Sequence, residues 1–234
     1  MSEENKKNDA KKDIKEGSEQ IKSEAKNTFN EAKESIKNVN FKNDAKVTSG
    51  YVTGLFKKPL ETIKEVASDS KNAKFKYALI LLILWLVVIL IKSLFGTHWA
   101  LSLVGFNFLN MIKDLLAPII GIVAISGITY FMQKSSKKKS LTTILTTVIT
   151  AMSPLILANV LTVLTLFSSE ISKITSPVRY FANVLTIVFT YFGLKSILGD
   201  EENSKFVNKF IVIEAIYYAV YFVFTFLGIY IPMI

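Results

Sequence analysis

Five long apolar segments dominate the second two-thirds of this chain, and a charged leader precedes them. The segments comprise residues 77–94, 115–132, 141–167, 178–198 and 206–231. An α-helix rises about 1.5 Å per residue, so about 20 residues cross a hydrocarbon core about 30 Å thick, and the two shortest segments are just long enough. The pattern therefore predicts an all-α fold, a polytopic membrane bundle with five transmembrane helices.

The leader, residues 1–55, is rich in Lys and Glu and has only a thin apolar stripe. The stripe consists of residues spaced by three, four or seven, namely Ile14, Ile21, Ala25, Ala32, Ile36 and Val39. Such spacing is typical of an amphipathic helix. Two interpretations remain open. The leader is a solvated or partly disordered tail, or it is a helix that lies on anionic lipid or pairs with a protein partner.

A second amphipathic piece lies in residues 56–76, directly before the first apolar segment. Pro59 suits the first turn of a helix, and Leu60, Ile63 and Ala67 then share one face. We expect this piece to lie at the inner membrane surface. The predicted organisation is therefore a charged leader (1–55), a juxtamembrane segment (56–76) and a transmembrane domain (77–234).

Lysines between the apolar segments indicate the orientation of the chain. They are concentrated in alternate connections, at Lys134, Lys137, Lys138 and Lys139 and again at Lys195, Lys205 and Lys209. Basic loops stay on the cytoplasmic side, so we expect a cell-membrane protein with its N-terminus in the cytoplasm and its C-terminus outside. No apolar h-region opens the chain, and the first segment is expected to act as its own uncleaved insertion signal. The lysines expected to contact lipid headgroups are Lys57, Lys58, Lys64, Lys137, Lys138 and Lys139.

Composition narrows the chemistry. Half of the 234 residues are hydrophobic, there is no Cys, and His98 is the only histidine. Disulfides and thiolate zinc sites are thereby excluded, and we predict no metal site and no cofactor. The net charge of +9 comes with basic residues beside the apolar segments. This charge is therefore explained by membrane topology. We predict that the chain's partner is the lipid bilayer and that it does not bind nucleic acid.

Glu214 is an acidic residue well inside an apolar segment, eight residues past the start of the fifth and about 12 Å along that helix. A charge there costs roughly 2.5–3.5 kcal/mol, so the side chain is either protonated or has a polar partner. The residues of the other segments that lie at the same depth in the membrane as Glu214 include Ser126, Thr147, Thr150 and Thr190. We predict a polar layer of these five residues. A structural Glu, a proton or ligand site, and a Glu that snorkels to the surface remain alternatives.

Nearer the other face, prolines and amides form a second set, Pro118, Pro154, Asn159 and Asn183. Each proline removes a backbone hydrogen bond, so we expect kinked helices packed by side-chain amides. The second segment also carries small residues at Ala117, Gly121, Ala124 and Gly127. These allow close helix packing, with a homodimer face as the alternative.

Several of these features together resemble the Yip1 domain family of polytopic membrane proteins. They are residues 56–60 before the first segment, the Pro-bearing second segment, the stretch 153–159 and the count of five segments. The resemblance covers residues 56–231, and the chain looks like a bacterial form. It implies a membrane scaffold or regulator, with the leader in place of the zinc ribbon that some relatives carry.

Three functions follow as hypotheses. The first is a non-enzymatic membrane scaffold or partner-binding regulator. The second is a small transporter or proton-coupled permease that uses Glu214. The third is an intramembrane enzyme, which the sequence disfavours because it contains no Ser/His, paired-Asp, HExxH or Cys/His set.

Overall fold

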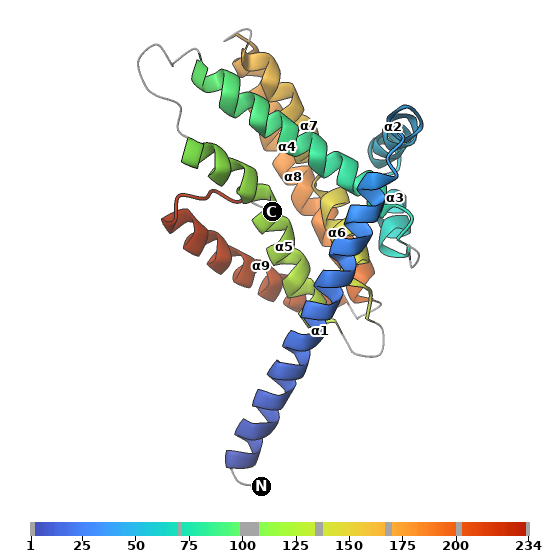
Figure 1. The fold of residues 1–234 in the computed structure, drawn as a ribbon, viewed down its shortest axis with the longest axis vertical. Coiled ribbons are helices and arrows are strands. Elements are labelled where there is room, and N and C mark those ends of the chain that lie inside the picture. The colour runs from blue at the N-terminus through green and yellow to red at the C-terminus, as the bar shows by residue number, and fades with distance from the viewer. Residues whose placement is uncertain are drawn as a thin grey trace.

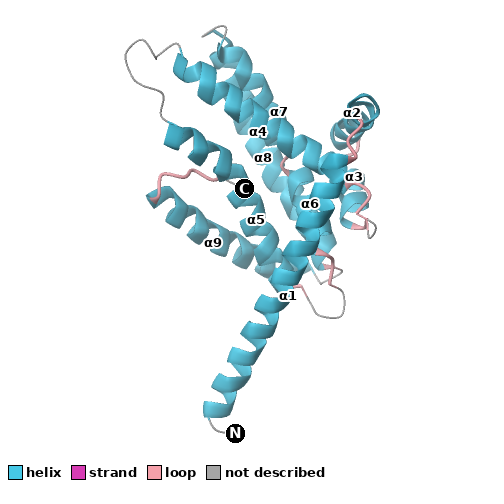
Figure 2. Cartoon of the chain, in the orientation of Figure 1, coloured by secondary structure: helices cyan, strands magenta, loops and turns pink. Residues whose placement is uncertain are grey.

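A computed structural model describes residues 3–69, 72–98, 108–133, 138–166, 170–199 and 203–232. In these residues the secondary structure is helical, with short connections and no strand (Figure 2). The elements in chain order are α1 (Glu3–Lys37), α2 (Phe41–Lys57), α3 (Pro59–Ala67), α4 (Phe75–His98), α5 (Phe108–Met132), α6 (Leu141–Ala151), α7 (Ser153–Thr162), the 3₁₀ helix η2 (Val163–Leu166), α8 (Glu170–Leu198) and α9 (Asn203–Phe226).

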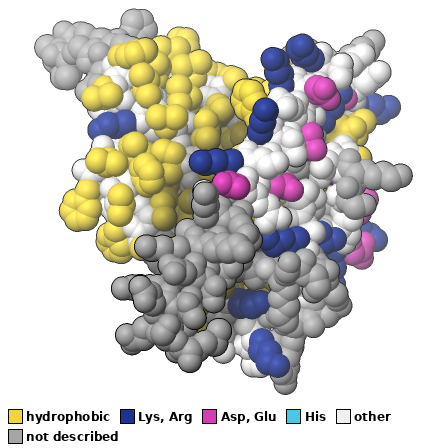
Figure 3. All heavy atoms as spheres, turned by 60° about the horizontal axis from the view of Figure 1, so that its bottom comes forward, with side chains coloured by type: hydrophobic (Ala, Val, Ile, Leu, Met, Phe, Trp, Pro, Cys, Tyr) yellow, Lys and Arg dark blue, Asp and Glu magenta, His cyan; other side chains and the backbone are white. Residues whose placement is uncertain are grey.

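The prediction of an all-α membrane bundle is confirmed. In the described part of the chain, α4, α5, α8 and α9 are each long and apolar enough to cross a membrane, and the bent pair of α6 and α7–η2 makes a fifth span if it is counted as one. Large apolar side chains remain exposed along these helices, most completely at Phe226. In Figure 3 apolar side chains cover one part of the surface, and charged side chains collect on another. This is a multi-pass membrane protein.

The leader and the spans define two ends of the bundle. We call the end where α1 to α3 lie, and where α4, α6 and α9 begin, the leader end, and the opposite end the distal end. Figure 1 shows α5 and α9 side by side, diverging from α4, α7 and α8 toward the distal end. The N-terminal half of α1 extends past the bundle, while its second half lies against α4 and α6.

Helix α6 is the buried centre of the leader end, with α1, α3, α4, α5 and α8 all packed around it. It carries five buried threonines, Thr142, Thr143, Thr146, Thr147 and Thr150. Three of these hydroxyls donate to the carbonyl oxygen four residues earlier, at 2.7 Å, 2.8 Å and 2.6 Å. The helix therefore satisfies much of its own polarity, which lets apolar neighbours enclose it.

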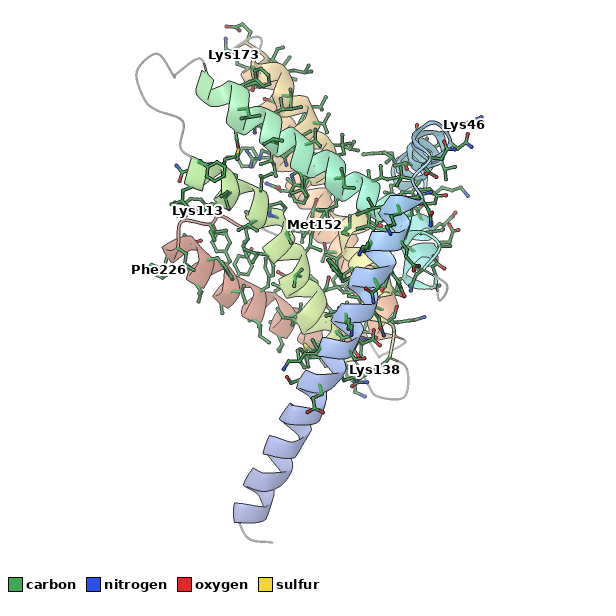
Figure 4. The ribbon with its side chains drawn as sticks, in the orientation of Figure 1. Lys46, Lys113, Lys138, Met152, Lys173 and Phe226 are labelled. Atoms are coloured by element: carbon green, nitrogen blue, oxygen red, sulfur yellow. The ribbon has the colours of Figure 1, made fainter. Side chains whose placement is uncertain are left out.

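The third predicted segment, 141–167, is broken rather than continuous. Helix α6 ends at Ala151 and α7 begins at Ser153, with an angle of 47° between the two parts of the pair. Pro154 lies in the first turn of α7, where its missing N–H costs little, because that group has no intrahelical acceptor in any case. Figure 4 places Met152, the residue at the break, near the middle of the bundle.

The fifth segment ends earlier than the predicted Ile231, because α9 stops at Phe226. Gly228 adopts a φ of +71°, a left-handed conformation that costs glycine little. The N–H of Ile229 donates to the carbonyl of Phe224 at 2.9 Å, and that of Gly228 to Thr225 at 2.9 Å. This is the hydrogen-bond pattern of a Schellman motif, which ends the helix and turns the chain.

After this turn the C-terminal tail runs back along α9 toward the middle of the bundle (Figure 1). The Tyr217 hydroxyl donates to the carbonyl oxygen of Pro232 at 2.6 Å. A Cβ on Gly121 of α5 would lie 2.9 Å from that hydroxyl and 3.0 Å from Pro232 Cδ. The small residue of α5 therefore accommodates the chain's own tail and α9 at this position.

Candidate functional site

At the leader end, buried polar contacts join the second half of α1 to the spans. Thr28 of α1 hydrogen-bonds Thr142 of α6 through their hydroxyls, 3.0 Å apart. Asn72 adds a second joint, because its amide nitrogen donates to Glu31 at 3.1 Å and its amide oxygen accepts from Thr143 at 3.0 Å. Asn72 has a φ of +53°, which Asn tolerates better than most residues. The leader is thus part of the folded protein.

A second junction links the start of α2 to the start of α4. The Lys76 ammonium lies 2.6 Å from Asp44 Oδ2 and donates to the carbonyl of Asn38 at 2.7 Å. Asp44 also accepts a hydrogen bond from the N–H of Asn40 at 2.6 Å. The Lys76 hydrogen bond lowers the pKa of the Asp44 carboxyl below its ordinary value. Asp44 is therefore charged at neutral pH.

Helices α2 and α3 pack against the inside of the bundle through an apolar cluster of Leu55, Ile63, Ala151 and Phe189. The predicted boundary between residues 55 and 56 falls inside α2, which continues to Lys57 before Pro59 starts α3. α3 lies against both α6 and α8. The pair is therefore an integral layer of the fold.

Tyr51 of α2 reaches Thr150, a member of the predicted polar layer, through a hydroxyl–hydroxyl hydrogen bond. Burial raises the pKa of the Tyr51 phenol, so it stays protonated. Sequence reasoning missed this residue, because a tyrosine in the charged leader has no local signal that it will meet the third span.

The five residues of the predicted polar layer are all removed from solvent to some degree. Ser126, Thr147, Thr150 and Thr190 are buried, and Glu214 is half-buried. Thr147 and Thr150 bond within α6, whereas Ser126 Oγ, Thr190 Oγ1 and Glu214 Oε1 have no hydrogen-bond partner among the described residues. No hydrogen bond in that part of the chain joins any two of the five.

The predicted headgroup lysines lie in different surroundings at the leader end. Lys57 at the end of α2, Lys58 between the two helices and Lys64 on α3 are all exposed. The Lys138 ammonium donates to Gln20 of α1 at 3.1 Å and lies over the Tyr130 ring. Lys139 is half-buried, with its N–H bound to Gln133 at 2.6 Å. Lys137 lies outside the described residues.

At the distal end a cleft of about 790 Å³ opens between the two diverging groups of helices. All five spans and the tail line it, with Trp85, Ile89, Lys92 and Ser93 from α4, Asp114, Ala117 and Pro118 from α5, Leu155 and Asn159 from α7, Ser176, Arg179, Tyr180 and Asn183 from α8, Tyr221 from α9, and Tyr230, Ile231 and Pro232 from the tail. Its volume is within the range of small-molecule sites.

The cleft brings together part of the predicted proline and amide set. Pro118, Asn159 and Asn183 line it, whereas Pro154 does not. The Asn159 amide donates to the carbonyl of Leu155, in its own helix, at 2.9 Å. It therefore does not pair with a carbonyl freed by a proline.

Three charged residues of the cleft come from different spans and interact across it. Lys92 interacts electrostatically with both Asp114 and Arg179. The Ser93 hydroxyl hydrogen-bonds the Asp114 carboxylate. None of the three was singled out from the sequence. Lys92, Asp114 and Arg179 all lie near the distal ends of their spans, and this shared position was the one sequence signal that they come together.

No group of three or more His, Asp or Glu that could hold a metal ion occurs in the part of the chain that the structure describes. Comparison with protein-family models, with curated proteins and with solved structures finds no match to this chain. The class of protein defined by the fold is a multi-pass membrane helix bundle with docked N-terminal helices. The Yip1 resemblance stays a prediction.

Proposed function

We propose that this chain is a non-enzymatic scaffold of the cell membrane whose N-terminal helices form a cytoplasmic platform for a protein partner. The observation that carries the proposal is the fixed position of α1. Its second half is held on α6 through Thr28 and on residue Asn72 through Glu31. A helix fixed in this way presents its outward face in one orientation, so a partner does not have to order it on binding.

The outward face of α1 carries apolar side chains that its own bundle leaves uncovered. Phe29 is 69% exposed and Ile36 is 50% exposed, and their spacing of seven residues places them on the same side of the helix. Aromatic and aliphatic anchors of this kind favour helix-to-helix docking. The N-terminal half of α1 extends beyond the bundle and adds reach (Figure 1).

The lysines support a cytoplasmic position for this platform. Lys138 and Lys139 precede α6, Lys195 is in the last turn of α8, and Lys205 and Lys209 are in the first turns of α9. All five lie at the leader end, and cytoplasmic loops are enriched in Lys and Arg. The sequence resemblance to Yip1 domain proteins also favours a scaffold.

The test is site-specific photo-crosslinking in the native membrane, with the photo-reactive residue at position 36. We expect one adduct of discrete mass with another protein. Phe29→Asp removes it, because a charge replaces the apolar anchor, whereas Asn30→Asp, on an adjacent exposed position, retains it. The proposal is wrong if no such adduct forms, or if it survives Phe29→Asp unchanged.

A proton-coupled transporter is a second candidate, favoured by the half-buried Glu214 with its unpartnered Oε1. An ionisable residue inside a span is a functional-site hypothesis in its own right. Proton-driven uptake into vesicles with Glu214→Gln separates the two candidates. Loss of a flux supports transport, and full retention of every flux removes that role.

A further inference from the structure

The distal cleft gathers its charges close to the membrane boundary. Lys92 lies three residues before the end of the first span at Phe95, hence about 5 Å from it. Asp114 and Arg179 each lie six residues after the start of their spans, about 9 Å in. Charged groups at such depth are costly unless they are paired or bind something. Three of them in one cleft therefore require an explanation.

Pairing accounts for only part of this charge. Lys92 and Arg179 are cations and Asp114 is the one carboxylate in the lining, so one positive charge remains. Asp114 interacts with Lys92 and with Ser93. Arg179 has no ion-pair partner among the described residues. Its planar guanidinium offers several N–H donors to an anion.

Neutral donors line the same cleft. Asn183 and Ser176 lie four residues after and three residues before Arg179 on α8, and Tyr221 and Tyr230 come from α9 and the tail. Amide and hydroxyl groups donate to oxyanions, and donors on several helices can meet a tetrahedral group from different sides. The lining therefore suits a phosphoryl group better than a cation.

Below the charges the cleft becomes apolar. Trp85 lies seven residues before Lys92 on α4, about 10 Å deeper, and is 3% exposed. Ile89 and Leu155 also line the wall. An anionic group at the mouth can therefore be attached to an apolar body that extends inward, as in an amphiphile.

We propose that the distal cleft binds a phosphoryl group, held by Lys92 and Arg179, from either a phospholipid headgroup or a soluble phosphate. This site is independent of the cytoplasmic platform, because it lies at the opposite end of the bundle. Asp114 offsets part of the positive charge of Lys92 and so lowers the affinity for the anion.

The test uses the full-length protein with Trp99→Phe, which leaves Trp85 as the one tryptophan. One arm titrates inorganic phosphate into this protein in dodecyl maltoside micelles, which carry no phosphoryl group. The other arm uses nanodiscs and compares quenching of Trp85 by brominated phosphatidylglycerol with quenching by a brominated diacylglycerol, which lacks the phosphoryl group. The first arm detects a soluble phosphate and the second a lipid headgroup.

We expect a saturable change in at least one arm. Arg179→Gln weakens it by about tenfold or more, since a charge-assisted hydrogen bond contributes roughly 1.5–3 kcal/mol. Asp114→Asn strengthens it, because a negative charge leaves the wall. Lys173→Gln, on the same helix but paired with Glu170 at the surface, leaves it unchanged.

Two results overturn the proposal. One is the absence of any saturable change in both arms. The other is equal binding by Arg179→Gln and Lys173→Gln. If Arg179→Gln fails to fold, the increase expected of Asp114→Asn decides the question, and binding by that variant at or below the unmodified level rejects the site.

Discussion

Single polar residues hold the leader on the spans, and each does so through a partner distant in sequence. Thr28 meets Thr142, Tyr51 meets Thr150, and Lys76 bonds Asp44. These side chains are buried or half-buried, and each is hydrogen-bonded or ion-paired with its partner. A buried polar group that loses its partner lowers the free energy of unfolding by about 1–3 kcal/mol. The docking of the leader is therefore sensitive to single substitutions.

Asp44 makes this sensitivity depend on pH. Its pKa is lowered by Lys76, so its contribution to stability is present above the ordinary carboxyl pKa and is lost as pH falls through the lowered value. We expect Asp44→Asn to lower the melting temperature in detergent at pH 7. The difference from the unmodified protein shrinks as the pH falls below about 4, and it disappears only below the lowered pKa of Asp44, where this carboxyl is also neutral.

The matched control is Glu61→Gln, which removes an exposed pair with Lys58. Surface pairs contribute about 0–1 kcal/mol, so this variant should melt like the unmodified protein at both pH values. Equal melting temperatures for Asp44→Asn and the unmodified protein at pH 7 would contradict the junction.

Glu214 has the opposite character, since one of its oxygens is buried without a partner. We expect Glu214→Gln to melt at the same or a higher temperature at pH 8, because it removes a group that is costly to charge inside a span. A gain of 1 kcal/mol corresponds to roughly 2–4 °C in a protein of this size. Glu170→Gln, at an exposed position, is the control. A clearly lower melting temperature for Glu214→Gln would reveal a specific partner for the carboxylate.

The sequence singled out Glu214 and Thr150 but not the residues of the leader that contact the spans. Helical rise alone gives the expected depth of Ser126, Thr147, Thr150 and Thr190 along their helices, and all four are buried. Which hydroxyl meets which neighbour depends on helix rotation and on docking of the leader, and neither follows from local pattern. For the same reason Tyr51 and Lys92 were missed.

At the scale of elements, Gly193 of α8 packs closely against α6 and makes ordinary contact with α3. A Cβ on Gly193 would lie 2.9 Å from Thr147 Cγ2 and 3.5 Å from Ile63 Cγ2. Gly127 of α5, by contrast, has nothing within 4 Å of such a Cβ. The two glycines therefore offer a matched pair in which helix propensity is the same and packing differs.

We expect Gly127→Ala to be neutral or to stabilise the protein by up to about 1 kcal/mol, because Ala is the better helix former. Gly193→Ala should instead destabilise it, because overpacking typically costs about 1–3 kcal/mol. Thermal melts in the same detergent compare the two. If both variants gain stability equally, α6 does not pack against Gly193 in the way described.

Local chemistry predicted that the spans exist but not where each begins, since α5 starts at Phe108 rather than at 115 and α8 at Glu170 rather than at 178. Apolar length was enough to identify α4, α5, α8 and α9, and Pro154 indicated a disturbance in the third segment. The break at Met152 and the return of the tail to Tyr217 were not visible, because each depends on neighbouring helices. The helical leader likewise owes its position to contacts with α4 and α6.

In the whole molecule, the N-terminal helices pack on the spans at the leader end, and the cleft opens at the distal end. Apolar spans connect the two ends. This arrangement separates the two proposed activities, a platform at the leader end and an anion site at the distal end. The platform proposal requires that the leader end lie in the cytoplasm, which puts the distal end on the opposite side of the membrane.

Single-cysteine labelling tests this requirement most directly, because the sequence contains no Cys of its own. Lys46→Cys and Lys138→Cys report on the leader end and Lys173→Cys on the distal end, and Figure 4 shows all three positions. With a membrane-impermeant maleimide, we predict labelling of Lys173→Cys in intact cells and of the other two only after permeabilisation. Labelling of Lys46→Cys or Lys138→Cys in intact cells, or protection of Lys173→Cys there, would contradict the orientation.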